Sequence, residues 1–303
     1  MAPVYKFALI QLQPKPVAPA ENFAKAESYI RQAAAQGCHL AVLPEYHLTS
    51  WAPEHPDFLA SLSSCGDYLP KYQALARELN INIVPGTICE AHPASAGNSS
   101  NSSSPDGQQK AAPDEIRNMA YFLAAGTGEV CGAYQKKNLW HPERPHLTSS
   151  GQSPHIAFDT PLGVRAGLLV CWDLAFPEAF RELVADGAQL IVVPSFWHLT
   201  DVDPRGRALN PDCERLFLES ALAARAFENT CAVAFCNSGG VSQVAMPILG
   251  ALGKVGMEEE RMSVVEVDFD VLRIAEENYR VREDMQREGW HYGHTLSRGT
   301  GKS

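Results

Sequence analysis

The 303-residue sequence predicts an α/β fold, because strand-like and helix-like segments alternate along most of its length. The predicted strands are continuously apolar, which is typical of strands covered on both faces. The hydrophobic fraction of 45% is ordinary for a globular core and excludes global disorder. We therefore expect a layered α/β protein.

The elements follow in order from the hydrophobic pattern. Short apolar runs bounded by turn residues predict strands, and these runs span residues 4–10, 40–43, 81–84, 119–125, 164–170, 190–193, 232–235 and 264–269. Apolar residues at helical spacing predict helices over residues 23–34, 62–79, 179–185 and 211–227. Gly37 follows the first of these helices, where a C-cap glycine belongs.

One segment, residues 91–115, interrupts the alternation. Its sequence, AHPASAGNSSNSSSPDGQQKAAPDE, is rich in Ser, Asn, Ala and Pro and has almost nothing to bury. This composition predicts a mobile surface loop between two neighbouring strands. Because no repeat or linker divides the rest of the chain, we expect one domain over residues 1–303 that carries this insert.

The charge and the cysteines limit the possible partners. The 35 acidic and 25 basic residues give a formal charge of −10, which disfavours binding to nucleic acid. No apolar run approaches the roughly 18–20 residues that span a bilayer, and the first residues do not resemble a signal peptide. The eight cysteines include no Cys-x-x-Cys pair, so we expect reduced thiols in a cytoplasmic protein without a metal or a membrane partner.

Cys171 stands out by its context, because it lies between the apolar segment 167–170 and a predicted helix. A strand-to-helix elbow exposes a side chain at the carboxyl end of a sheet and directs the following backbone N–H groups at a bound molecule. The positive end of the helix would also lower the pKa of a thiol there. Cys171 is thus a candidate nucleophile, although a small buried side chain is the simpler interpretation.

Three charged residues accompany it at or near the ends of strands. Glu45 ends the second apolar strand, where a buried carboxylate is unfavourable without a partner or a task. Lys136 is one of two adjacent lysines on a strand, of which at most one faces a site. Glu143 follows seven residues later, beside an arginine. Taken singly, each is most simply a surface charge.

In combination, these motifs resemble those of the nitrilase superfamily of carbon–nitrogen hydrolases. The matching segments are Leu-Pro-Glu45, Tyr-Gln-Lys136-Lys-Asn-Leu with Pro-Glu143, and Cys171-Trp-Asp-Leu-Ala-Phe-Pro-Glu178. The segment Asn278-Tyr279-Arg-Val-Arg282-Glu-Asp284 also resembles the family's C-terminal tail, which would begin near residue 279. The resemblance extends over the chain apart from the insert.

The resemblance implies a four-layer α-β-β-α sandwich that forms a homodimer through helices near the nucleophile. It implies that Cys171 is the nucleophile, Glu45 the general base and Lys136 the cationic oxyanion stabiliser. Glu143 would be the second glutamate, which orients the substrate and the charge network. No cofactor is implied, and the expected partner is a small-molecule amide or nitrile.

This assignment is chemically coherent. Glu45 would take the thiol proton as Cys171 attacks the amide or nitrile carbon, protonate the departing ammonia, and later activate water against the thioester. Lys136 and the backbone N–H of Trp172 would stabilise the developing oxyanion by roughly 3–4 kcal/mol per donor. We also expect Trp172, Phe196 and Trp197 to contact the substrate, although the last two could equally be aromatic core at a sheet edge.

The sequence leaves four functions open. The first is an amidase-type hydrolase that releases ammonia or an amine from a small amide, and the second is a nitrilase that uses the same residues. The third is a catalytically silent binding or scaffold protein, and the fourth a papain-like hydrolase with a histidine base. The motif does not decide among them, because Trp172 resembles nitrilases, Phe176-Pro-Glu178 resembles amidases, and Ala175 stands where many amidase relatives carry arginine. Asn138 also replaces the histidine that is common two residues after the lysine.

Overall fold

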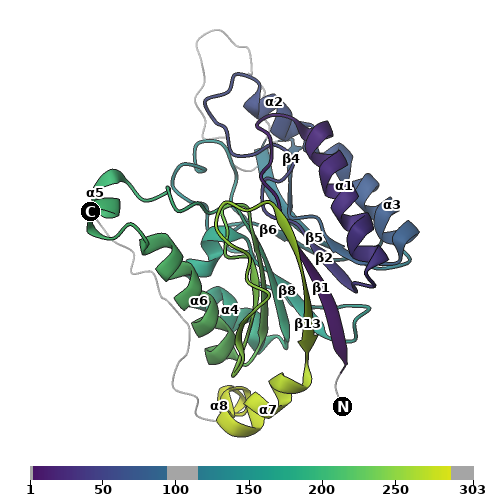
Figure 1. Ribbon diagram of the computed structural model, residues 1–303, viewed down its shortest axis with the longest axis vertical. Helices are drawn as coiled ribbons and strands as arrows, with labels where there is room; N and C mark the ends of the chain where they lie inside the picture. The colour runs from purple at the N-terminus through teal and green to yellow at the C-terminus, as the bar shows by residue number, and fades with distance from the viewer. Residues whose placement is uncertain (1–2, 94–114, 288–303) are drawn as a thin grey trace, which may run out of the picture.

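The computed structural model describes residues 3–93 and 115–287 (Figure 1). Two β-sheets pack face to face, and a pair of helices covers the outer face of each sheet (Figure 1). This order of layers confirms the predicted α/β class and the α-β-β-α sandwich. No helix within the described ranges is long and apolar enough to cross a membrane, and all eight cysteines are free thiols.

The first sheet has the strand order β13-β1-β2-β3-β5-β4, and β6 also pairs with β5. In chain order its strands are β1 (Val4–Gln11), β2 (Leu40–Val42), β3 (Asn82–Val84), β4 (Thr87–His92), β5 (Glu115–Leu123), β6 (Val130–Gln135) and β13 (Arg261–Asp268). Strands β1, β2 and β3 are parallel, and the remaining pairs are antiparallel.

The second sheet has the order β12-β11-β10-β9-β8-β7. Its strands are β7 (Phe158–Asp159), β8 (Arg165–Leu168), β9 (Leu190–Ser195), β10 (Ala232–Asn237), β11 (Gln243–Met246) and β12 (Gly250–Leu252). Strands β8, β9 and β10 are parallel, as expected for strands joined by crossover helices.

Helices α1 (Pro19–Ala35) and α3 (Leu69–Leu79) cover the first sheet, and α4 (Pro177–Ala185) and α6 (Cys213–Asn229) cover the second (Figure 1). The remaining helices are α2 (Phe58–Ser63), η1 (Cys65–Tyr68), η2 (Cys171–Ala175), α5 (Pro204–Leu209), α7 (Asp270–Tyr279) and α8 (Val281–Gln286). Helices α7 and α8 pack at one end of the sandwich, where the guanidinium of Arg282 donates to the carbonyl oxygens of Ala188 (2.7 Å) and Thr230 (3.2 Å).

Burial on both faces explains why the strands are continuously apolar. Phe7 and Leu9 of β1 belong to the core between the two sheets. Ala8 and Ile10, which alternate with them, pack with Ile30 of α1 on the other face of the sheet. Strand β1 therefore has no solvent-facing row in its centre, as the sequence pattern indicated.

The expected continuous helix over residues 62–79 is wrong. The structure has α2, η1 and α3 in succession there, and Pro70 lies in the first turn of α3. Proline lacks an amide hydrogen and its ring clashes with the preceding turn, so it fits the start of a helix but not the middle. The helical spacing of apolar residues continues through this break, because α2, η1 and α3 all bury their apolar side against the first sheet and its loops.

The ends of the predicted insert 91–115 belong to strands. Strand β4 extends to His92 and β5 begins at Glu115, earlier than the residue 119 that the sequence indicated, and these two residues lie opposite each other in the antiparallel pair. The strands that flank the insert are therefore neighbours. Residues 94–114, which form the rest of it, lie outside the described part of the chain.

Candidate active site

The predicted site residues follow strands whose carboxyl ends share one edge of the sandwich. Glu45 follows β2 and Lys136 follows β6. Strand β6 is antiparallel to β5, and β2 is parallel to β3, which is itself antiparallel to β5, so β2 and β6 run in the same direction. Cys171 follows β8 of the other sheet. The backbone N–H of Phe196, just after β9, donates to Glu45 Oε2 (3.1 Å) and joins the two sheets at this edge.

Glu45, Lys136 and Glu143 form a buried ion cluster. Lys136 Nζ lies 2.9 Å from Glu45 Oε1 and 2.7 Å from Glu143 Oε1, and the exposed fractions of the three residues are 1%, 1% and 2%. Charges buried this deeply are unfavourable unless they are paired and hydrogen-bonded. The expectation of surface charges for these three residues taken singly therefore fails, and the structure brings them together.

A tight turn holds Glu45 in place. Tyr46, the next residue, has a φ of +50°. Gly86 packs under the turn with a φ of +58°, and a Cβ there would lie 1.9 Å from the carbonyl oxygen of Pro44. Only glycine permits this approach of the chain after β3, so Gly86 helps fix where the carboxylate of Glu45 points.

Two hydrogen-bonding residues of the cluster were missed in the sequence. Asn118 of β5 donates from Nδ2 to Glu45 Oε1 (2.8 Å), and the hydroxyl of Tyr46 donates to Glu143 Oε1. The backbone N–H of Trp140 also donates to Glu143 Oε2 (2.7 Å). A polar asparagine in an otherwise apolar strand was the available signal for Asn118, whereas nothing in the sequence distinguished Tyr46 from an ordinary buried aromatic.

Cys171 occupies the predicted elbow. It has a φ of +47° and is the first residue of the 3₁₀ helix η2, a backbone conformation that is strained for a residue with a side chain. The backbone N–H of Trp172 has no hydrogen-bond partner among the described residues, as is usual for the first amide groups of a helix. This N–H is therefore available to a bound oxygen atom.

The thiol of Cys171 is less acidic than the sequence predicted. Burial raises the pKa of Cys171, the charge of Glu45 raises it further, and Lys136 lowers it, with a net upward shift. The sequence had indicated a lowered pKa from the helix end, but desolvation outweighs that effect. The resting thiol is consequently neutral and needs a base to become nucleophilic.

The pKa of Glu45 suits a residue that acts as this base. Burial raises its pKa to about 7, with Lys136 acting to lower the pKa and Glu143 to raise it. A carboxylate that titrates near neutrality can both accept and return a proton at physiological pH. The Cys171 thiol is also a hydrogen-bonding neighbour of this carboxylate.

Asp173 is the most extensively bonded residue that sequence reasoning left without a role. Its Oδ2 accepts from the backbone N–H of Val170 (2.8 Å) and the hydroxyl of Tyr134 (2.8 Å). Its Oδ1 accepts from the backbone N–H (3.1 Å) and Nδ2 (2.8 Å) of Asn138. Asp173 thus ties the Cys171 elbow to the segment that carries Lys136. Asn138, noted as a departure from the family pattern, supplies two of these four bonds.

A cavity of about 290 Å³ opens beside Cys171. Its wall contains the three residues predicted to contact a substrate, Trp172, Phe196 and Trp197. The other residues that line it are Trp140, His141, Ala175, Asp201, Glu214 and Phe217. The cavity therefore joins the thiol to a mainly aromatic pocket, which is the usual form of a small-molecule site.

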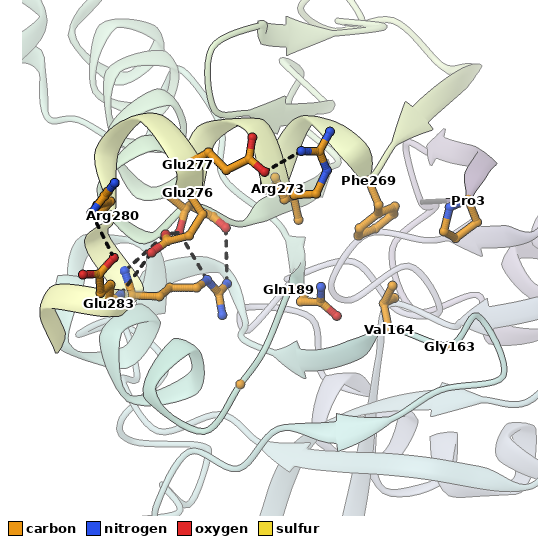
Figure 2. A pocket seen from close by; sticks show the side chains of 14 residues that line it. Pro3, Gly163, Val164, Gln189, Phe269, Arg273, Glu276, Glu277, Arg280 and Glu283 are labelled. Atoms are coloured by element: carbon orange, nitrogen blue, oxygen red, sulfur yellow. Dashed lines mark hydrogen bonds and ion pairs between the residues drawn. The ribbon is translucent and has the colours of Figure 1, made fainter. Parts of the chain in front are cut away.

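A second cavity, of about 830 Å³ and drawn in Figure 2, lies at the opposite end of the strands from Cys171. It is lined by Gln189, just before β9, and by residues of α7 and α8. Figure 2 shows its charged side chains paired with one another, as in Arg273 with Glu277 (2.6 Å) and Arg280 with Glu283 (3.7 Å). None of the predicted catalytic residues lines it, so it is not the active-site candidate.

Fold and site together define a four-layer α/β protein with a buried Glu–Lys–Cys arrangement at the sheet edge. Residues 6–276 match the family model described as carbon-nitrogen hydrolase. The chain therefore belongs to the carbon–nitrogen hydrolase family, the nitrilase superfamily, as the sequence motifs suggested.

Several relatives of this chain are amidases. It is 29% identical over 279 residues to the omega-amidase NIT2 of Bos taurus, covering 90% of this chain and 91% of that protein. It is 27% identical over 283 residues to the 2-oxoglutaramate amidase of Bacillus subtilis, covering 89% and 93%. These similarities make it an amidase-like carbon–nitrogen hydrolase.

Solved structures of similar fold agree with the assignment to this family. An amidase from Nesterenkonia sp. superposes with a TM-score of 0.65 at 26% identity, covering 89% of this chain and 92% of that one. Other structures of that amidase hold butyramide, or carry the acetamide moiety of fluoroacetamide covalently added to the active-site cysteine. Nit3 of Saccharomyces cerevisiae has a TM-score of 0.72 at 20% identity, covers 94% and 97%, and supports the fold.

Proposed function

We propose that this protein is an amidase that hydrolyses a small carboxamide through a thioester on Cys171. The observation that carries the proposal is the buried Glu45–Lys136 pair, 2.9 Å apart, next to a neutral thiol that opens into a cavity. The butyramide held by the Nesterenkonia amidase supports an amide as the substrate.

Acylation begins with proton transfer from the Cys171 thiol to the carboxylate of Glu45. The sulfur forms a bond to the amide carbon, and the carbonyl π electrons move to the oxygen. In this proposal Lys136 Nζ and the backbone N–H of Trp172 donate to the oxyanion, and each such hydrogen bond is worth roughly 3–4 kcal/mol in comparable sites. Collapse of the intermediate breaks the C–N bond, and Glu45 returns its proton to the leaving ammonia.

Deacylation uses the same groups in reverse. Glu45 takes a proton from water, whose oxygen attacks the thioester carbon. The C–S bond then breaks, the carboxylic acid leaves, and the proton returns to the Cys171 sulfur. Glu143 has no part in these transfers; it holds Lys136 against Glu45 and keeps the ammonium charged in a buried place.

Two other functions compete with an amidase. A nitrilase would use the same three residues, and a nitrilase of Pyrococcus abyssi is 26% identical over 275 residues. A silent scaffold would have no use for the buried charges, which are unfavourable to folding when they are not fully paired. The retained ion cluster beside the thiol therefore favours an enzyme.

Ammonia release from butyramide and from butyronitrile, measured side by side, tests the proposed function. We expect turnover of the amide and little or none of the nitrile, because the oxyanion donors face an oxygen that only the amide carries. Turnover of the nitrile alone would make the protein a nitrilase. If neither compound is hydrolysed and neither modifies a cysteine, a broader panel of short amides is assayed in the same way. Failure of the whole panel would contradict the amidase function and support a binding or scaffold function.

Exchanging Asp173 for Asn should reduce kcat about 10- to 100-fold and leave KM within about threefold, because the Cys171 elbow would shift relative to Lys136. The new amide group would face the donors of Asn138, so two hydrogen bonds would become repulsive. Steady-state kinetics and the pH dependence of Cys171 alkylation by iodoacetamide measure the effect.

Asp159→Asn, a change at an exposed carboxylate outside the site, is the matched control and should retain normal kinetics. A lower melting temperature for Asp173→Asn with unchanged kcat and alkylation would show that Asp173 supports only the fold.

A further inference from the structure

Two carboxylates, Asp201 and Glu214, line the cavity beside Cys171, and no lysine or arginine among residues 3–93 and 115–287 does. Asp201 comes from the loop after β9, and Glu214 lies in the first turn of α6. In the described part of the chain, His141 is the only other titratable side chain of the wall apart from the thiol. The acidic character of the pocket is therefore not balanced by a basic residue in its own lining.

Each of the two carboxylates has one oxygen engaged with the protein. Asp201 Oδ2 accepts from the backbone N–H of His198 (2.9 Å), and Glu214 Oε2 accepts from Nε1 of Trp197 (2.8 Å). Within residues 3–93 and 115–287, neither carboxylate forms an ion pair or a hydrogen bond through its second oxygen. The ring of His198 instead lies 3.9 Å from Glu258. Two acceptor atoms with negative charge thus remain for a ligand.

The pKa of Asp201 is raised in this pocket, which means that its charged form is unfavourable there. Burial raises its pKa, the backbone N–H and the ring of His198 lower it, and Glu214 raises it again. Two carboxylates that repel each other inside a partly buried pocket are stabilised when a cation binds between them.

The remaining wall is suited to the same kind of ligand. The rings of Trp172 and Trp197 lie 5.2 Å apart, and those of Trp197 and Phe217 stack at 5.3 Å. Trp140 and Phe196 complete the wall. Aromatic faces attract ammonium groups, and Trp attracts them most strongly.

The basic residues nearby line a different cavity. Lys137 and Arg144 belong to a neighbouring space of about 290 Å³ that shares only Trp172 with the first and does not contain Cys171. Within the cavity of the thiol, Ala175 is a small uncharged residue that offers a ligand no positive charge. A carboxylate at the far end of a substrate would therefore meet Asp201 and Glu214 without a partner.

We propose that the preferred substrate is a short amide whose far end carries an ammonium group, bound by Asp201, Glu214 and the surrounding aromatic rings. This inference rests on the proposed amidase function and adds the charge of the substrate. The volume of about 290 Å³ is at the small end for ligand sites, which favours a chain of a few carbon atoms.

Three amides of similar size and different charge test the inference: 4-aminobutyramide (cation), pentanamide (neutral) and succinamate (anion). We expect kcat/KM to be about tenfold or more higher for the cation than for pentanamide, and lowest for the anion. Equal or higher values for pentanamide overturn the proposal. A preference for succinamate, the charge type of 2-oxoglutaramate, does so too and would indicate that Lys137 and Arg144 receive the substrate.

Two conservative variants locate the preference. Glu214→Gln and Asp201→Asn keep an acceptor for Trp197 and for His198, and each should lower the ratio of kcat/KM for the cation over pentanamide by about tenfold. Glu219→Gln, on α6 but outside this cavity, should leave the ratio unchanged. An unchanged ratio in both active-site variants contradicts the proposal.

Binding separates this inference from the proposed function. Cys171→Ala cannot form a thioester, so titration calorimetry of this variant with the three amides measures recognition alone. If the wild-type enzyme hydrolyses none of the amides but the variant still binds 4-aminobutyramide most tightly, the amidase function fails and the charge preference stands. Hydrolysis without any preference for the cation in either assay overturns the charge preference and leaves the amidase function intact.

Discussion

The Cys171→Ala variant is expected to release no ammonia from any amide above background, a loss of at least about 10⁴-fold in kcat. The thiol at the elbow is the only sulfur that lines the cavity next to Glu45. Its sulfur forms the covalent intermediate, and no other group at this position can take that part. Coupled ammonia detection with butyramide and 4-aminobutyramide measures the loss.

Cys131→Ala is the matched control. Cys131 is a partly buried free thiol on β6, away from the cavity, and its removal should leave kcat within about twofold. If Cys171→Ala kept substantial activity, the nucleophile would lie elsewhere and the site would have to be abandoned.

The second large effect is expected for Glu45→Gln, which should lower kcat about 1,000-fold or more, because Gln cannot accept the proton in either half of the reaction. The side-chain size is retained, but the single oxygen of Gln cannot accept from both Lys136 Nζ and the backbone N–H of Phe196. The melting temperature of the variant is therefore measured beside its kinetics, and an unchanged fraction of folded protein assigns the loss to the missing base. Glu90→Gln, in the first sheet and bonded to Tyr121, is the control with expected near-normal kinetics.

The pH dependence gives a second measure of the same residue. Because the pKa of Glu45 is raised to about 7, Glu45 is increasingly protonated below this pH and cannot act as a base. The kcat/KM of the wild-type enzyme should therefore fall as pH decreases through 7, by about tenfold per pH unit well below it. In the residual activity of Glu45→Gln this acidic limb should be absent.

A papain-like mechanism makes the opposite prediction for Glu45. It needs a histidine base, and among the residues that the structure describes His141 is the only histidine that lines the cavity of the thiol. Near-normal activity of Glu45→Gln together with a severe loss in His141→Gln would support that mechanism. The hydrogen-bonding contact of Glu45 with the thiol favours the reverse result.

The sequence predicted the fold class, and it singled out four candidate site residues whose roles stay a prediction. Buried parallel strands are continuously apolar, so Glu45 and Cys171 stand out as polar residues at strand ends. Lys136 and Glu143 were recognisable only through the family motif, because a lysine or glutamate near a strand end is usually solvated. The structure brings these four side chains to one edge of the sandwich.

Other features depend on contacts between distant segments. The role of Asp173 requires Tyr134 and Asn138 to converge on it from the other sheet, and the raised pKa of the thiol depends on how deeply the elbow is buried. The break before α3 was hidden because the apolar spacing continues through it. The homodimer remains a prediction, and the exposed Leu216 and Phe227 of α6 are where we expect the partner to pack.

The central claim is that amide cleavage passes through a thioester on Cys171. Rapid acid quenching of the wild-type enzyme during turnover of butyramide, followed by peptide mass spectrometry, tests this claim most directly. The account predicts a mass increase equal to one butyryl group on the peptide that contains Cys171, lost when turnover ends. Steady ammonia release with no acylated peptide at any time, or acylation of another cysteine, would contradict it.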